Sequence, residues 1–130
     1  MESINIKERI DIGGRDVPLW YDMAAMERGV DVFGSVDELH AAMEHQEGRN
    51  AISDMIRMIV TLGNNGLEME NKKPDLDEKI VKHHLKMMRM GEYASAVNKA
   101  LAEGYRREIS DAQQDGPRDA YLEEDEGKNA

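Results

Sequence analysis

The segment from Ala51 to Leu62 is the most apolar stretch of the chain, and it constrains the fold more than any other feature. Placed around a helix, its large apolar side chains cover an arc of about 200°; they are Ile52, Met55, Ile56, Met58, Ile59, Val60 and Leu62. Other elements have to cover most of such a helix. We therefore expect a central helix over residues 51–62, with Ile56 and Ile59 anchoring the core and Gly63 just beyond its end.

Alternating apolar residues near the N-terminus predict a β-hairpin. Val17 and Leu19 alternate with polar residues after the Gly13-Gly14 pair, and four isoleucines alternate before it, at Ile4, Ile6, Ile10 and Ile12. Two adjacent glycines favour a two-residue turn because they reach positive φ. Pro18 lacks a backbone N–H, so the second strand should lie at an edge. A lone hairpin is marginally stable, and we expect this one to pack on helices.

Capping signals predict two helices before the central one. Asp22 is a suitable N-cap for a short helix that reaches Gly29. Ser35 and Glu38 have the spacing of a capping box, which predicts a second helix that ends near Gly48.

After the central helix, residues 64–73 are polar and predict a loop. Asp75 is then expected to cap a helix that Gly91 interrupts, with Leu76, Ile80, His84 and Met87 on one side. The opposite side carries a basic stripe of Lys79, Lys82, Lys86 and Arg89. A last helix should span residues 93–109 and present a narrow stripe of small residues at Ala96, Val97, Ala100 and Gly104.

These elements predict a mainly α protein with a short N-terminal β-hairpin (α+β). It would have four to five helices in a domain of residues 1–110, followed by an acidic flexible tail of residues 111–130. The formal net charge is −10, and half of it lies in the tail. Only Tyr121 and Leu122 could bury much surface there, so we expect the tail to be disordered or to fold on a partner. These two residues are candidate partner contacts.

Composition and spacing argue against several function classes. The chain has no cysteine, which excludes disulfides and thiolate metal sites. It contains no apolar run of the roughly 20 residues that a membrane helix needs, and no secretory start, so we expect it to stay where it is made. Its acidity argues against binding nucleic acid.

Neither the histidines nor the glycine pair indicates chemistry. His40 and His45 are five residues apart and His83 and His84 are adjacent, so neither pair has the i, i+4 spacing of a helical zinc site. Gly13-Gly14 is followed by no phosphate-loop lysine, and no serine has a glycine-elbow context. We expect no catalytic residue, no cofactor and no metal.

The ten methionines have two interpretations. They either fill core volume that aromatic residues often fill, or form a plastic surface that adapts to variable partners. Met87, Met88 and Met90 are the best candidates for such a surface because they span more than one helical face. The basic stripe is either a solvated face or the acceptor of an acidic tail, its own or a neighbour's.

The order of these elements resembles a known family. The opening IDIGGRDVPLWYDMAAMERG, then GSVDELHAAM, ISDMIRMIVTLGNNGLE and PDLDEKIVKHHL, is similar to the tail assembly chaperones of long-tailed bacteriophages. The resemblance covers roughly residues 4–110. It implies a protein that binds the tape measure protein, keeps it soluble, helps recruit tail tube protein and is absent from the mature virion. It also implies the host cytoplasm as location, and possible self-association.

The family resemblance further implies a second, longer product made by a −1 ribosomal shift. Codons for Glu126 to Asn129 can contain a slippery heptamer, so we expect one there. The rival interpretation of the whole chain is an acidic helical adaptor or inhibitor that occupies a basic partner surface, for example as a nucleic-acid mimic. Salt dependence distinguishes the two, because a mimic would lose its partner steeply as salt rises.

Overall fold

The computed structural model describes residues 4–44, 48 and 50–114. The elements follow one another in the order β1 (Arg9–Ile12), β2 (Arg15–Pro18), α1 (Met23–Phe33), α2 (Val36–Glu44), α3 (Ala51–Met69), α4 (Glu78–His84), the 3-10 turn η1 (Met87–Arg89) and α5 (Met90–Gln114). The protein is therefore mainly α with a short N-terminal hairpin, as the sequence predicts.

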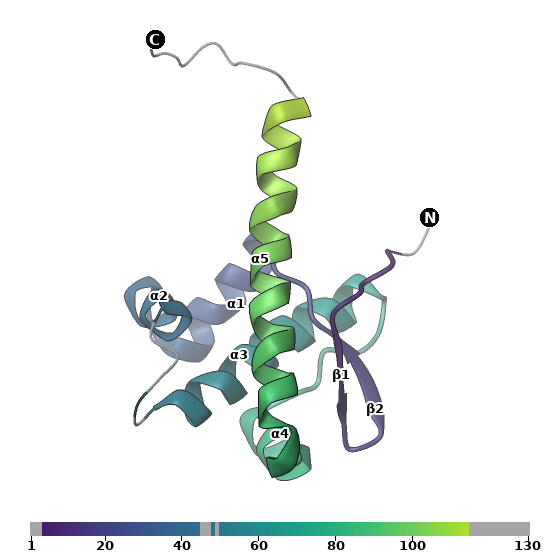
Figure 1. Cartoon of the computed structure of the whole chain (residues 1–130), viewed down its shortest axis with the longest axis vertical. Coiled ribbons are helices and arrows are strands. Elements are labelled where there is room, and N and C mark those ends of the chain that lie inside the picture. Colours follow the sequence, from purple (N-terminus) through teal and green to yellow (C-terminus); the bar gives the residue numbers. More distant parts are fainter. Residues whose placement is uncertain (1–3, 45–47, 49, 115–130) are drawn as a thin grey trace.

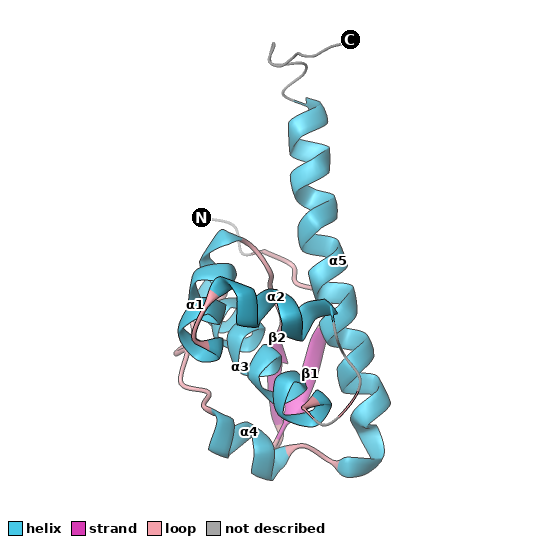
Figure 2. Ribbon diagram, turned by 90° about the vertical axis from the view of Figure 1, so that its left-hand side faces the viewer, coloured by secondary structure: helices cyan, strands magenta, loops and turns pink. Residues whose placement is uncertain are grey.

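Helix α3 lies at the centre of the fold and contacts α1, α2, α4, α5 and β2 (Figure 1). Ile56 and Ile59 on this helix are buried, which confirms both as core residues. Helix α5 runs past the other elements and projects beyond them at its C-terminal end (Figure 2). The small residues predicted on α5 do face the core, because Ala96, Val97 and Ala100 are buried.

The hairpin forms as predicted. Gly13 and Gly14 have φ of 60° and 88°, the positive values that the turn needs. Ile10 pairs with Val17, and both side chains are buried against the helices. The sheet has two strands in the described part of the chain, so Pro18 lies on an edge strand.

The predicted end of the central helix is wrong, because α3 continues to Met69 and the predicted loop over residues 64–73 is mostly helical. Gly63 lies inside the helix, where an added Cβ would meet the side chains of Leu76 and Val17. Gly63 and Gly66 allow other parts of the chain to approach α3 closely, and neither of them ends the helix. At Gly66 the backbone of Pro18 comes so near that no side chain fits.

The polar pair Asn64-Asn65 is buried in this second half of α3, and both side chains form hydrogen bonds there. The Asn64 amide donates to the Leu76 carbonyl and its oxygen accepts from the Leu76 N–H, both at 2.9 Å. Asn65 donates to the Trp20 carbonyl at 3.0 Å and to the Asp22 carboxylate at 2.9 Å. The two side chains thereby supply hydrogen-bond partners for buried backbone groups of neighbouring loops, namely the N–H and carbonyl of Leu76 and the carbonyl of Trp20.

Helix α1 also differs from its predicted end. Asp22 does cap α1, accepting from the Ala25 N–H at 3.1 Å, but the helix continues past Gly29. Gly29 packs against Leu39, and Gly34, with φ of 100°, terminates the helix instead. The described part of α2 reaches Glu44, and residues 45–47, where the helix is predicted to end before Gly48, lie outside the described residues.

The C-terminal helices need two corrections. Asp77, not Asp75, caps α4 by accepting from the Ile80 N–H at 2.7 Å, because Asp75 binds Arg15 instead. The chain breaks at Leu85, not at Gly91, and α5 already begins at Met90. Since α5 continues to Gln114, residues 111–114 are helical rather than part of a flexible tail. Residues 115–130, with Tyr121 and Leu122, lie outside the described residues.

Candidate functional site

An apolar groove of about 290 Å³ lies between α2, the first half of α3 and the first half of α5. Methionines come from all three helices, with Met43 on α2, Met55 and Met58 on α3, and Met90 on α5. The rest of the lining consists mostly of small or aliphatic residues, namely Ala42, Ala51, Ile52, Gly91, Ala94, Val97 and Leu101, with Asp54 and Asn98 as polar members. The groove can therefore accept apolar side chains along its length.

The lining residues differ in how firmly they are held. Met58 is buried and belongs to the core, whereas Ile52 keeps 55% of its surface exposed. Met55 is half-buried between these extremes. A methionine side chain has three rotatable bonds and a polarisable sulfur, so it changes shape at low cost. Such a wall accommodates side chains of different shape better than one built of leucine or phenylalanine.

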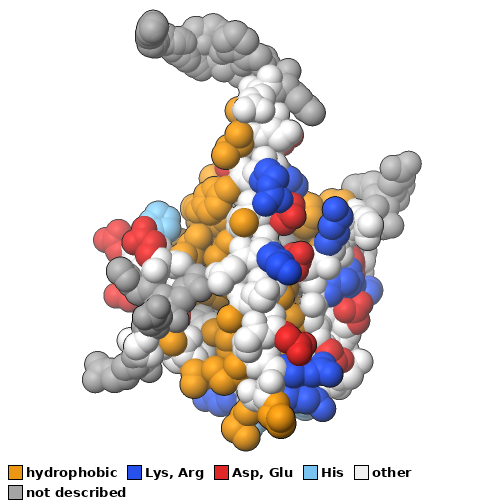
Figure 3. All heavy atoms as spheres, viewed as in Figure 1, with side chains coloured by type: hydrophobic (Ala, Val, Ile, Leu, Met, Phe, Trp, Pro, Cys, Tyr) orange, Lys and Arg blue, Asp and Glu red, His pale blue; other side chains and the backbone are white. Residues whose placement is uncertain are grey.

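A second, more open hollow of about 450 Å³ continues the groove along α2 and α5. It shares Met43, Asn98 and Leu101 with the first, and Tyr105 extends it towards the projecting end of α5. Figure 3 shows apolar side chains gathered along the side of α5 that faces α2. Ile109, one turn beyond Tyr105, is largely exposed. Together the two hollows form a long apolar surface.

Acidic residues border this surface on the α2 side. Helix α2 carries Asp37, Glu38 and Glu44 but no lysine or arginine. Glu44 lines the second hollow together with His40, and Asp54 of α3, which forms an ion pair with Arg57, lines the first. The groove thus presents an apolar floor with a negative rim, which suits an amphipathic helix that carries basic residues beside its apolar stripe.

Two tyrosines fix the position of α5 beside the second hollow. The Tyr21 and Tyr105 hydroxyls lie 3.2 Å apart, and their rings meet edge to face with centroids 5.4 Å apart. Burial, followed by the bond to Tyr105, raises the pKa of Tyr21 above its ordinary value. Gly104 allows this contact, because an added Cβ would lie 2.6 Å from the Tyr21 carbonyl oxygen.

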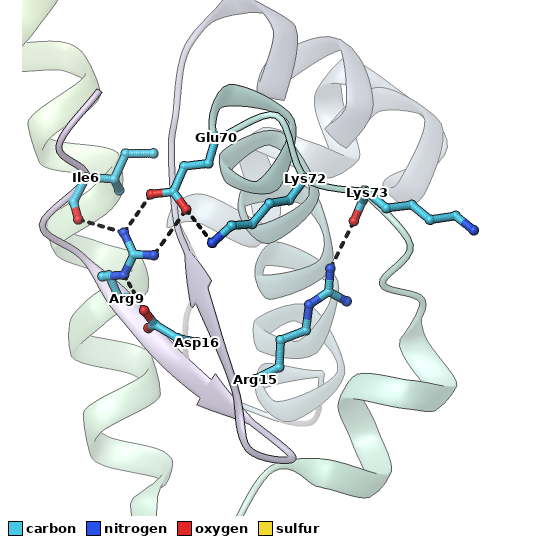
Figure 4. A network of polar contacts seen from close by, with 7 residues as sticks. All are labelled: Ile6, Arg9, Arg15, Asp16, Glu70, Lys72 and Lys73. Atoms are coloured by element: carbon cyan, nitrogen blue, oxygen red, sulfur yellow. Dashed lines mark hydrogen bonds and ion pairs between the residues drawn. The ribbon is translucent and has the colours of Figure 1, made fainter. Parts of the chain in front are cut away.

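A charged network joins the hairpin to the end of α3 (Figure 4). The Arg9 guanidinium binds Glu70 in a bidentate manner, at 2.8 and 3.1 Å, and also binds Asp16 at 2.8 Å. Arg9 holds the pKa of the Glu70 carboxyl below its ordinary value, and Glu70 raises that of Arg9. Every member of the network has an ion-pair partner and none faces the groove. We assign it a structural role.

Replacing Glu70 with glutamine should lower the free energy of unfolding by about 1–2 kcal/mol at neutral pH. The folded-state pKa of Glu70 is lowered, so its contribution is present above the unfolded-state pKa and is lost as pH falls through the folded-state value. The difference between wild type and Glu70→Gln should therefore shrink in acid, as measured by urea unfolding at several pH values. Asp16→Asn is the control, because Asp16 binds the same guanidinium while mostly exposed. If the difference in free energy of unfolding between wild type and Glu70→Gln stayed constant with pH, this explanation would be contradicted.

The predicted site residues occupy two separate places. Met90 lines the groove, but Met87 and Met88 lie on η1, away from it, with 88% and 98% of their surface exposed. Sequence reasoning missed Ile52, Met55 and Leu101 as groove residues. The apolar arc of about 200° on the central helix could have predicted Ile52 and Met55, because both lie on the part of that arc that the neighbouring helices leave uncovered.

The histidines form no ligand set in the described part of the chain. His40 borders the second hollow, while His83 and His84 are exposed on α4, where the His84 Nδ1 lies 2.8 Å from the Ile80 carbonyl. His45 lies outside the described residues. No group of three potential metal ligands occurs among residues 4–44, 48 and 50–114. Separately, no helix within these residues is long and apolar enough to cross a bilayer.

Comparison with known proteins adds no relative: no family model, no curated protein and no solved structure matches the chain.

Proposed function

We propose that this protein is a tail assembly chaperone of a long-tailed bacteriophage, which holds apolar helical segments of the tape measure protein in the α2–α3–α5 groove. The observation that carries the proposal is the groove itself, with its methionine walls and acidic rim. The order of hairpin and helices, on which the family resemblance rests, supports it. In this role the protein works in the host cytoplasm, helps recruit tail tube protein, and leaves before the virion is complete.

The groove chemistry suits a client that has many similar binding segments. A long helical protein presents apolar side chains at i, i+3, i+4 and i+7, and these aggregate when left uncovered. Flexible methionines can cover such stripes without one fixed sequence, since binding then depends on shape adaptation more than on exact hydrogen bonds. Catalysis plays no part in this proposal.

Co-expression tests the proposal. The wild-type protein should raise the soluble yield of the tape measure protein, which we expect the long coiled-coil-rich reading frame immediately downstream to encode. The double variant Ile52→Asp/Met90→Asp places a carboxylate on two walls of the groove and should reduce that yield several-fold. Both positions are in the first turn of a helix, where an added carboxylate is compatible with the helix dipole.

A matched control distinguishes damage to the groove from a general effect of two added negative charges. The double variant Met23→Asp/Ile80→Asp makes the same substitutions in the first turns of α1 and α4, at exposed positions that do not line the groove. It should protect the tape measure protein as well as wild type does. Equal protection by the groove variant, with its fold intact by circular dichroism, would contradict the proposed groove.

Salt concentration distinguishes this role from that of an acidic adaptor or inhibitor. An apolar groove should retain its client in about 0.5 M NaCl, where surface charges are screened beyond a few ångströms. An adaptor that relies on the net charge of −10 would release its partner under the same conditions.

A further inference from the structure

Two consecutive methionines form an exposed tip at the corner between α4 and α5. Met87 and Met88 keep 88% and 98% of their surface exposed, more than any other large apolar residue of the described chain. We call Met87 and Met88, with the cations Lys79 and Lys82 of α4 and Lys86 and Arg89 at η1, the methionine tip. It lies outside the groove and has no part in the proposed chaperone contact.

The fold holds this corner in place. The Lys86 N–H donates to the hydroxyl of the buried Tyr93 at 2.8 Å, and the Arg89 N–H donates to the Lys86 carbonyl at 2.9 Å. The Leu85 N–H closes the end of α4 by donating to Val81 at 3.1 Å. Hydrogen bonds on both sides of η1 therefore present the two methionines to solvent in a fixed turn.

The segment that carries the tip is basic although the whole chain is strongly acidic. Residues 79–91 contain four lysine or arginine residues and no aspartate or glutamate, and Glu78 and Glu92 flank them. Within the described residues, none of the four tip cations forms an ion pair with a carboxylate. Apolar and basic side chains lie side by side at the lower end of the molecule (Figure 3). A complementary partner would carry an apolar pair among carboxylates.

The chain itself contains such a segment. Residues 115–126 include six carboxylates and one arginine, and Tyr121-Leu122 is the only pair of adjacent large apolar residues among them. We propose that residues 115–126 of one copy dock on the methionine tip of a second copy. Tyr121 and Leu122 then cover Met87 and Met88, and the flanking carboxylates surround the tip cations.

Geometry favours a second copy over the same chain. Helix α5 starts directly after the tip and leads away from it for 25 residues, so Gln114 lies about 36 Å from Met90. Leu122 follows Gln114 by eight residues and can move at most about 29 Å from it, even with the chain fully extended. Even a fully extended segment would leave the Leu122 Cα about 7 Å short of Met90, so docking on its own tip would require a completely straightened chain. The tip of a neighbouring copy is not subject to this limit.

This contact joins two different surfaces, so a pair of copies keeps one tip free on one copy and one acidic segment free on the other. Contacts of this heterologous kind continue from copy to copy unless the geometry closes a ring. The protein should accordingly associate in a concentration-dependent way into dimers and larger species, and added salt should weaken the association because charges contribute to it.

Sedimentation velocity of the full chain over a range of concentrations tests the contact. Met87→Ser/Met88→Ser and Tyr121→Ser/Leu122→Ser should each weaken self-association by at least about tenfold, since each removes two apolar side chains from the contact. Met23→Ser is the control: Met23 is 69% exposed on α1, away from the tip, and its replacement should leave association unchanged. An unchanged thermal melt would show that the tip variant is folded.

Mixing the two double variants gives the most specific result. The tip variant retains its acidic segment and the segment variant retains its tip, so a mixture can form one complete contact. It should yield a one-to-one pair with wild-type affinity and nothing larger. Variants that associate like wild type would overturn the proposal, and so would a mixture that stays monomeric. A wild-type chain that is monomeric at every concentration would also overturn the proposal. The same holds if that monomer binds phosphatidylserine vesicles through its tip, because the tip would then serve a membrane and not a second copy.

Discussion

Replacing Gly66 with alanine should destabilise the domain by about 2 kcal/mol or more, although alanine is the better helix former. An added Cβ would overlap the carbonyl oxygen of Pro18 and lie 2.6 Å from its carbonyl carbon. Both atoms belong to the backbone, so β2 and α3 would have to move apart. That movement would also strain the hydrogen bond from the Trp20 N–H to the Leu62 carbonyl, 3.2 Å long.

Gly91→Ala is the matched control for this prediction. Gly91 also lies in a helix, but an added Cβ there meets no atom within 4 Å. Alanine should therefore be neutral or stabilise the protein by up to about 1 kcal/mol. Urea unfolding followed by circular dichroism compares the two variants. A Gly66→Ala protein as stable as Gly91→Ala would show that β2 does not approach α3 as closely as the structure indicates.

Local signals in the sequence predict much of the fold. The Gly13-Gly14 turn, the Asp22 cap and the Ser35 cap are all present in the structure. Each depends on residues within a few positions of one another, so the sequence alone contains the information. The central position of α3 is also predictable, because a helix that is apolar over so wide an arc needs neighbours on several sides.

The second half of α3 could not be predicted from local signals. Gly63, Asn64, Asn65 and Gly66 are poor helix formers and together favour a loop. Their partners lie elsewhere in the chain, such as Pro18 against Gly66 and Leu76 bonded to Asn64. These tertiary contacts outweigh helix propensity, and no pattern within residues 63–66 reveals them.

The candidate site was only partly predictable for the same reason. A run of methionines drew attention to Met87, Met88 and Met90, but a turn at η1 sends the first two away from the third. The groove combines Met90 with residues of α2 and α3 that lie far from it in sequence. Composition predicted the kind of surface, and the packing of three helices determined its place.

Replacing Ile59 with alanine should lower the free energy of unfolding by about 2–5 kcal/mol, a large share of the roughly 5–15 kcal/mol that stabilises a small domain. The Ile59 side chain is fully buried in the core cluster that unites the hairpin with the helices. Truncation removes apolar contacts and leaves a cavity, which a close-packed interior fills only in part. Thermal and urea unfolding should both show the loss.

Ile52→Ala is the control on the same helix, with the same substitution at a side chain that keeps 55% of its surface exposed. It should change the free energy of unfolding by about 0.5 kcal/mol or less. The two variants also separate stability from the proposed binding, because Ile52 lines the groove and Ile59 does not. Ile52→Ala should weaken protection of a client while the protein stays folded, whereas Ile59→Ala should weaken protection only as it unfolds. Equal losses of stability at the two positions would contradict the assignment of one face of α3 to the core and its edge to the groove.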